Sequence, residues 1–120
     1  MAIKVNFQSH LDVILDKAHA AMDRSGQDLS EFLVEIVQDE ILYGYNKPIV
    51  DTGALFDSIQ AEVQRASQNA YSVNAGSNLH YAKYVHNGTS KMKARPFVRS
   101  AFNKNQAKIK EVMTEPFKNA

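Results

Sequence analysis

The stretch Ile59-Gln60-Ala61-Glu62-Val63-Gln64 alternates apolar and polar residues, and Tyr71-Ser72-Val73-Asn74-Ala75 repeats the pattern. A period of two is typical of a β-strand that buries one face. The intervening Ala66-Ser67-Gln68-Asn69 reads as a turn, so the two stretches are predicted to form an antiparallel hairpin. Two strands alone are marginally stable. The hairpin is therefore expected to pack on a helix, to gain another strand, or to pair with a neighbouring copy. Val50–Asp51 and Met92–Arg95 are the candidate extra strands.

Upstream of the hairpin, apolar residues recur at helical spacing. They are Phe7, Leu11, Ile14, Leu15, Ala18 and Met22, continued by Leu29, Phe32, Leu33, Ile36 and Val37. The apolar face stays in phase across Ser25-Gly26, which favours one long helix from about Gln8 to Tyr43. A glycine inside that helix costs roughly 1 kcal/mol relative to alanine. The alternative is two helices, with Gly26 ending the first and Asp28 beginning the second.

Shorter helical segments are predicted around and after the hairpin. Thr52-Gly53 is expected to open a short one, and Tyr81–Val85 to form a helical turn that ends at Gly88. Pro96 suits the first turn of a C-terminal amphipathic helix, which Pro116 breaks. The predicted fold class is α+β, with a long N-terminal helix and a C-terminal helix packed on a small antiparallel β-sheet built around the hairpin. Residues 1–120 are expected to form a single domain.

The composition is that of an ordinary globular protein without cysteine, so no disulfide or thiolate site is available. No run approaches the roughly 18 apolar residues of a membrane span, and no conventional export signal is evident. Charge is unevenly distributed. Residues 1–64 carry 11 acidic and 4 basic residues, a net charge of −7, whereas residues 91–118 carry 8 basic and 2 acidic residues, a net charge of +6. This asymmetry predicts contacts between copies or a basic face turned toward DNA.

No motif indicates catalysis or a cofactor. The four histidines show no metal-binding spacing, and the glycines form no phosphate-binding loop. Ser58, His86 and Asp51 could be drawn as a triad, but nothing in their spacing favours it. His86 is expected at the surface. The prediction is a protein that is not an enzyme and that holds no metal or cofactor. Lys91, Lys93, Arg95 and Arg99 form the only concentrated basic feature, which could contact phosphates.

Three ordered blocks of sequence form a distinctive pattern. The first block is Thr52, Gly53, Leu55, Ser58 and Ile59. The second is Tyr81, Ala82, Val85, Gly88 and Thr89. The third is Met92, Ala94, Pro96, Phe97 and Arg99. Together they resemble the tail-completion (neck, or head–tail joining) family of long-tailed double-stranded DNA phages. The chain departs from the family where a glutamate usually precedes the Gly-Thr step, because His86-Asn87 stands there.

The resemblance implies a virion structural protein, made in the host cytoplasm, that completes the tail or joins it to the DNA-filled head. Its expected partners are other neck and tail proteins and further copies of itself, in a ring that is sixfold in such proteins. In isolation the chain is expected to be monomeric. We expect Thr89–Arg95 to order on assembly, with Lys91, Lys93 and Arg95 contacting a partner or DNA. A tail terminator is a close variant. The alternative from another class is a nucleic-acid-binding accessory domain that uses the basic C-terminal third.

Overall fold

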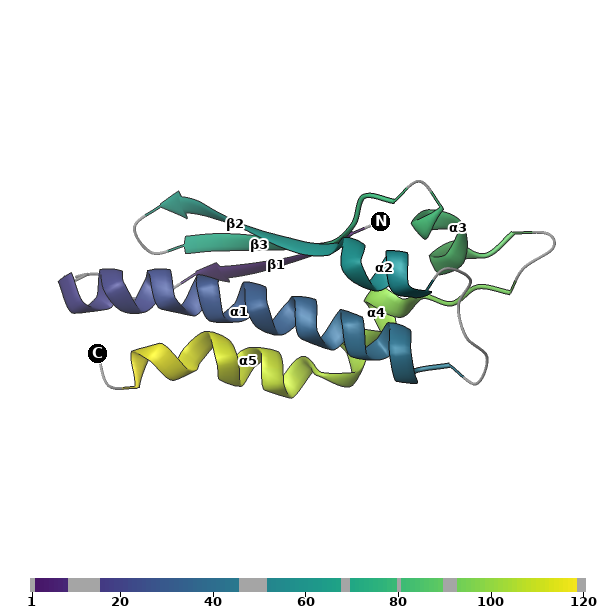
Figure 1. Cartoon of the computed structure of the whole chain (residues 1–120). Helices are drawn as coiled ribbons and strands as arrows, with labels where there is room; N and C mark the ends of the chain where they lie inside the picture. The colour runs from purple at the N-terminus through teal and green to yellow at the C-terminus, as the bar shows by residue number, and fades with distance from the viewer. Residues whose placement is uncertain are drawn as a thin grey trace.

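The computed structural model describes residues 2–8, 16–45, 52–67, 70–79, 81–89 and 93–118. The molecule is elongated, with extents of 54 × 22 × 20 Å. Its elements, in chain order, are β1 (Ala2–Gln8), α1 (Asp16–Tyr43), α2 (Thr52–Ser58), β2 (Ile59–Ser67), β3 (Ala70–Ser77), α3 (Ala82–Asn87), α4 (Phe97–Lys104), α5 (Gln106–Thr114) and the 3-10 turn η1 (Glu115–Phe117). A small sheet lies on α1, with α5 alongside α1, so the predicted α+β class is confirmed (Figure 1).

The predicted hairpin forms as β2 and β3, and the sheet gains a third strand that the sequence pattern did not predict. The strand order is β1-β3-β2, with both outer strands antiparallel to β3. The helix was expected from about Gln8, but residues 2–8 form β1; the helix is described from Asp16 onward, and residues 9–15 lie outside the described residues. Of the candidate extra strands, Val50–Asp51 and Met92 lie outside the described residues, and 93–95 have no regular structure.

Helix α1 runs without interruption through Gly26, so the two-helix alternative is wrong. This glycine lies where the helix crosses the sheet closely. A Cβ atom at position 26 would stand 2.9 Å from Cγ1 of Val63 and 3.6 Å from the ring of Tyr71. Gly26 therefore allows the helix backbone to approach β2 and β3, and the propensity cost of glycine is offset by this packing.

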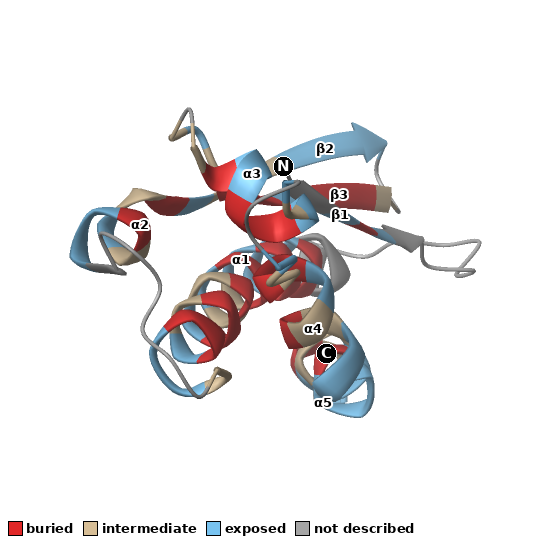
Figure 2. Cartoon of the chain, turned by 90° about the vertical axis from the view of Figure 1, so that its right-hand side faces the viewer, coloured by how far each residue is buried: buried red, intermediate tan, exposed pale blue. Residues whose placement is uncertain are grey.

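The core lies between α1, α4 and one face of the sheet. The largest of its fully buried side chains include Leu29, Leu33, Val73 and Phe97. Figure 2 shows the buried residues on the inner sides of the helices and along β3. The opposite face of the sheet has no helix over it among the described residues, and its outer strands expose polar side chains there, including Lys4, Asn6, Gln60, Glu62 and Gln64. The sheet is thus half covered, as is common for antiparallel sheets.

The C-terminal helix was expected to be continuous as far as Pro116, but the structure divides it at Asn105. This residue leaves the helical region of the backbone (φ −122°, ψ 19°), and its side-chain amide donates a 2.8 Å hydrogen bond to the carbonyl of Ala101. That bond satisfies one of the carbonyls left free at the end of α4. The chain then turns into α5, which packs along α1, and Pro116 lies in η1 as the expected break.

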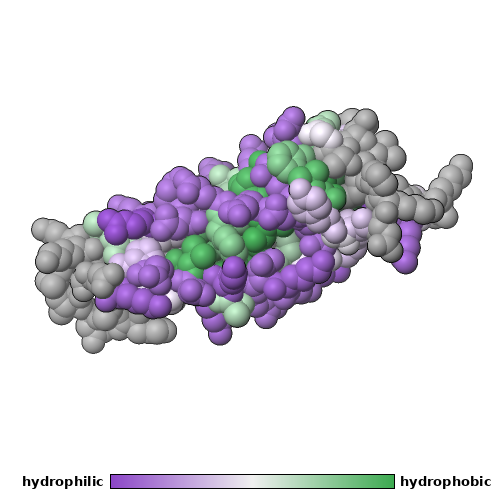
Figure 3. Space-filling model, turned by 60° about the horizontal axis from the view of Figure 1, so that its bottom comes forward, coloured by the Kyte–Doolittle hydropathy of each residue, from purple (hydrophilic) through white to green (hydrophobic). Residues whose placement is uncertain are grey.

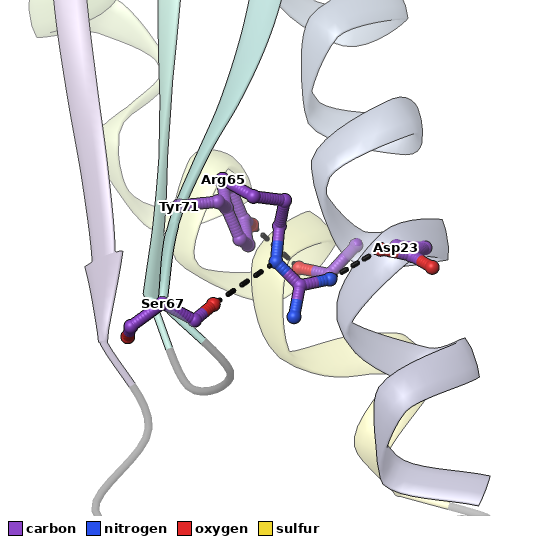
Figure 4. A network of polar contacts seen from close by, with 5 residues as sticks. Asp23, Arg65, Ser67 and Tyr71 are labelled. Atoms are coloured by element: carbon purple, nitrogen blue, oxygen red, sulfur yellow. Dashed lines mark hydrogen bonds and ion pairs between the residues drawn. The ribbon is translucent and has the colours of Figure 1, made fainter. Parts of the chain in front are cut away.

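The side chain of Ser25 connects α1 to β3 and to α5 through two hydrogen bonds. Oγ of Ser25 lies 2.5 Å from the hydroxyl of Tyr71 and 2.6 Å from the carbonyl oxygen of Met113. A hydroxyl has one hydrogen to donate, so Tyr71 donates to Ser25 and Ser25 donates to Met113. Next to this pair, Arg65 of β2 reaches the carboxylate of Asp23 and donates to the carbonyl of Ser67 (Figure 4). These contacts therefore fix the position of α1 relative to β2, β3 and α5.

Candidate assembly surface

Two of the sequence blocks and the described part of the third gather at one end of the long molecule, where α2, α3 and the start of α4 lie (Figure 1). In the first block, α2 leads directly into β2. Leu55 is fully buried and Ile59 nearly so. Gly53 is exposed, and a Cβ atom added there would have no neighbour within 4 Å. The amide of Gln38 donates to the carbonyl of Phe56 at 3.1 Å, which ties α2 to α1. The first block thus anchors this end to the core.

Ser58 extends the anchor to the segment before α3. Its hydroxyl donates to the carbonyl of Leu55 at 2.7 Å and lies 2.6 Å from Oγ of Ser77. Oγ of Ser77 in turn accepts a hydrogen bond from the backbone N–H of Leu79 at 3.1 Å. Because the hydrogen of Ser58 is already donated, Ser77 must donate to Ser58. The series of hydrogen bonds therefore leads from the N–H of Leu79 through the two serine hydroxyls to the carbonyl of Leu55. Ser58 is therefore a structural link, and the geometry of a triad with His86 and Asp51 cannot be built because Asp51 lies outside the described residues.

The second block forms α3 and its end. Ala82 and Val85 are buried, and Tyr81 precedes the helix. Gly88 ends it with φ 79°, where its N–H donates to the carbonyl of Tyr84 at 2.7 Å. A positive φ is unfavourable for residues with a Cβ, so glycine is required here and the expectation of a helical turn ending at Gly88 is confirmed. Thr89 follows and is exposed.

In the third block, Pro96 turns the chain into α4. The N–H of Phe97 donates to the carbonyl of Arg95 at 2.7 Å, and Pro96 has φ −75° and ψ 68°. These values define an inverse γ-turn. The N–H of Arg95 donates to the carbonyl of Val85 at 2.8 Å, so the segment before α4 is tied to α3. Phe97 is fully buried, Ala94 and Arg99 are exposed, and Met92 lies outside the described residues.

His86 is buried, against the expectation of a surface position. Its ring meets Phe97 edge to face, with centroids 5.6 Å apart and planes at 79°. Nδ1 lies 3.1 Å from the side-chain oxygen of Asn87, an acceptor, so this nitrogen carries the hydrogen. Burial lowers the pKa of His86, the bond to Asn87 opposes that shift, and the positive charge of Arg99 adds to it. His86 is therefore a packing residue that joins the second block to the third.

Some basic residues of the C-terminal third are exposed, and others interact with side chains of the same chain. Lys93 and Arg99 are exposed, and Lys91 lies outside the described residues. The guanidinium of Arg95 lies 5.9 Å from the ring centre of Tyr45, Lys104 pairs with Glu40, and Lys118 pairs with Glu115. Lys83, which no sequence motif marks, is exposed on α3 with its ammonium over the ring of Tyr84. Exposed cations thus lie on α3 (Lys83), before and on α4 (Lys93 and Arg99) and on α5 (Lys108 and Lys110).

Exposed apolar side chains at the same end were also missed. Tyr43 is 80% exposed, Tyr84 48% and Leu42 44%. Leu42 and Tyr43 end α1, and Tyr84 lies on α3, where the ammonium of Lys83 stands over its ring. Their exposure could not be read from the sequence, because Leu42 and Tyr43 continue a helix in which most other described apolar residues, such as Leu33 and Val37, are buried. The face formed by the helices is, by contrast, mostly hydrophilic, with apolar groups along its middle (Figure 3).

The described residues give no support to a metal-binding or membrane-spanning role. Within the described ranges, no group of three or more histidine, cysteine, aspartate or glutamate residues is placed to hold a metal ion. The helices of those ranges also include none that is long and apolar enough to cross a membrane. Two hollows of the described surface, of about 410 Å³ and 370 Å³, are lined mainly by residues of the sheet strands.

A family model described as "Bacteriophage HK97-gp10, putative tail-component" matches residues 2–88. The chain belongs to this family of phage tail components. The match includes the first block and the second as far as Gly88, whereas the third block lies beyond it. No curated protein and no solved structure matches the chain.

Proposed function

We propose that this chain is the structural protein of the phage neck that completes the tail and joins it to the DNA-filled head. The observation that carries the proposal is the gathering of the sequence blocks at one end of an elongated tail component. That end combines rigid anchoring through Ser58 and Phe97 with exposed Tyr43, Tyr84 and Lys93. A joining protein needs a stiff body and a terminal surface that a second protein can cover, and the chain offers both.

In this role the chain acts without catalysis or a cofactor, as one subunit of a ring in the virion. The terminal surface faces either the head or the tail, and Thr89–Arg95 contacts the neighbouring protein with Lys91, Lys93 and Arg95. Residues 90–92 lie outside the described residues, so this part of the proposal rests on the sequence and on the exposed Lys93 beside them. The oppositely charged ends were expected to meet between copies, and exposed Glu31, Glu35 and Asp39 on α1 remain available for that contact.

Electron microscopy of particles from the parent phage with this gene deleted tests the proposal. We expect DNA-filled heads beside separate tails of finished length, because without the joining protein the two parts would stay unconnected. Complementation with the wild-type gene restores joined virions, whereas a Tyr43→Ala/Tyr84→Ala variant restores fewer. Normal infectious virions from the deletion would refute the neck assignment. Tails of abnormal length would indicate a terminator instead.

The second candidate, a nucleic-acid-binding accessory domain, draws on the exposed Lys83, Lys93 and Arg99. In the same C-terminal third, Lys104 and Lys118 form ion pairs with Glu40 and Glu115. These pairs reduce the positive charge that could contact phosphates. Binding of the purified protein to duplex DNA, measured across a salt series, separates the candidates. Tight binding at physiological salt that weakens in Lys83→Ala/Lys93→Ala would favour the accessory domain.

A further inference from the structure

The outer strands β1 and β2 lie on either side of β3, so each has an edge that no other described strand pairs with (Figure 1). In Lys4–Asn6 and Gln60–Gln64, the backbone pairing that the structure describes is with β3 alone. Every second residue of these segments therefore directs its N–H and C=O away from the sheet. Natural proteins usually protect such edges with proline, charges or bulges. In β2 the irregularity falls between Arg65 and Ser67, so Ile59–Gln64 is a regular edge.

We propose that the β2 edge of one copy pairs with the β1 edge of the next, so that the sheets continue from subunit to subunit. This deepens the proposed function and rests on its ring, because it names the surfaces through which copies associate. A ring requires two different surfaces on opposite sides of one subunit, and the two edges satisfy that requirement. Both strands are antiparallel to β3 and so run in the same direction. The new pairing is therefore parallel.

Charge across the new junction is complementary. The register places Lys4 and Glu62 on either side of Asn74, and all three share the exposed face of the sheet. If β1 of the next copy extends the sheet in the same register, its Lys4 lies directly beside Glu62. Opposite charges at directly paired positions stabilise a strand pair. Within one chain the two side chains are separated by β3, so this attraction is realised only between copies.

The residue positions next to Lys4 and Glu62 along the strands would also pair similar side chains across the junction. Asn6 and Gln64 flank Ser72 on the exposed face, so the junction would set one amide beside another. On the face toward the helices, Val5 and Val63 flank Val73. Val73 is fully buried while Val63 on the edge is only half-buried. Val5, which is largely buried within its own chain, would stand in the same row as Val63 of the neighbouring copy. A second copy thus supplies charged, amide and apolar partners in successive rows.

Disulfide trapping tests the pairing, because the chain has no cysteine of its own. In the double variant Lys4→Cys/Glu62→Cys, the two sites of one chain are two strand spacings apart, roughly 10 Å. A disulfide needs Cα atoms within about 7 Å, so a bond can form only between copies. Complemented phage particles carrying this variant are oxidised and run on non-reducing gels. We expect a ladder of covalent multimers that extends beyond the dimer.

The controls separate the failure of this pairing from the failure of the ring. Each single variant provides one thiol and can give at most a dimer, and Lys4→Cys/Lys108→Cys places the second thiol on α5, away from the edges. An amine cross-linker applied to wild-type particles reports the ring independently. Multimers with the amine cross-linker but no cysteine ladder would overturn the edge pairing and leave the ring intact. Dimers from Glu62→Cys alone would overturn it in favour of β2 pairing with β2. Monomers with both reagents would overturn the ring as well.

Discussion

The ammonium of Lys104 lies 2.8 Å and 3.0 Å from the two carboxylate oxygens of Glu40. Glu40 is buried, whereas the side chain of Lys104 is 58% exposed. The acidic first half of the chain and its basic C-terminal third therefore meet already within one molecule. Gly44 makes room for this pair, because a Cβ at that position would stand 2.4 Å from a carboxylate oxygen of Glu40.

Removing only the lysine should be more harmful than removing the charge of the glutamate. Lys104→Met leaves a buried carboxylate at the C-terminal end of α1, where the helix dipole also disfavours it, and should lower the free energy of unfolding by about 2 kcal/mol. Glu40→Gln leaves no buried charge and should cost about 1 kcal/mol or less. Urea unfolding of both variants and of the double variant measures this. Equal losses in the two single variants would contradict the explanation.

The hydrogen bonds of Ser25 predict that Ser25→Ala destabilises the protein more than Tyr71→Phe does. Ser25→Ala leaves both the hydroxyl of Tyr71 and the carbonyl of Met113 without that partner, so we expect a loss of about 2–3 kcal/mol in the free energy of unfolding. Tyr71→Phe removes one donor and leaves the bond from Ser25 to Met113, so about 1 kcal/mol is expected. Urea denaturation followed by circular dichroism measures both. A larger loss in Tyr71→Phe would show that the assigned direction of the bonds is wrong.

The sequence was sufficient to predict what depends on local periodicity. The hairpin, the continuous long helix and the helical turn ended by Gly88 follow from patterns within a few residues of one another. Strand β1 was not predicted because Phe7 fits both a helical and a strand periodicity of apolar residues. It belongs to the helical series with Leu11 and Ile14, and also to the alternating series with Ile3 and Val5. The second series would have revealed the strand. The break at Asn105 carries neither glycine nor proline, so no strong local signal marks it.

What depends on distant contacts could not be predicted. Ser25 meets Tyr71 and Met113, which lie 46 and 88 residues away in sequence. The sequence shows only a serine before a glycine in a helix. His86 is buried because α4 brings Phe97 against it. For the same reason, the second and third sequence blocks look like separate motifs until the bond between Arg95 and Val85 joins them.

Substitutions at two glycines should act in opposite directions. Alanine normally stabilises a helix interior by about 1 kcal/mol relative to glycine. Gly53→Ala in α2 meets open space and should be neutral or stabilising by about 0.5 kcal/mol. Gly26→Ala would press on Val63 and should destabilise by about 1–3 kcal/mol. The double variant Gly26→Ala/Val63→Ala should recover part of that loss. Thermal and urea unfolding test all three, and a stabilised Gly26→Ala would refute the close approach of helix and sheet.

His86 should make stability depend on pH. Burial lowers its pKa in the folded state below the ordinary value of about 6.5. Between those two values the unfolded chain binds the proton more readily, so the free energy of unfolding rises with pH. The contribution of His86 is therefore fully present above about pH 6.5 and is lost as the pH falls below that value. His86→Leu keeps an apolar contact with Phe97 and cannot titrate. Urea unfolding at pH 7.5, 6.5 and 5.5 should show a smaller loss for this variant than for the wild type. Parallel losses in the two proteins would show that other groups govern the acid sensitivity.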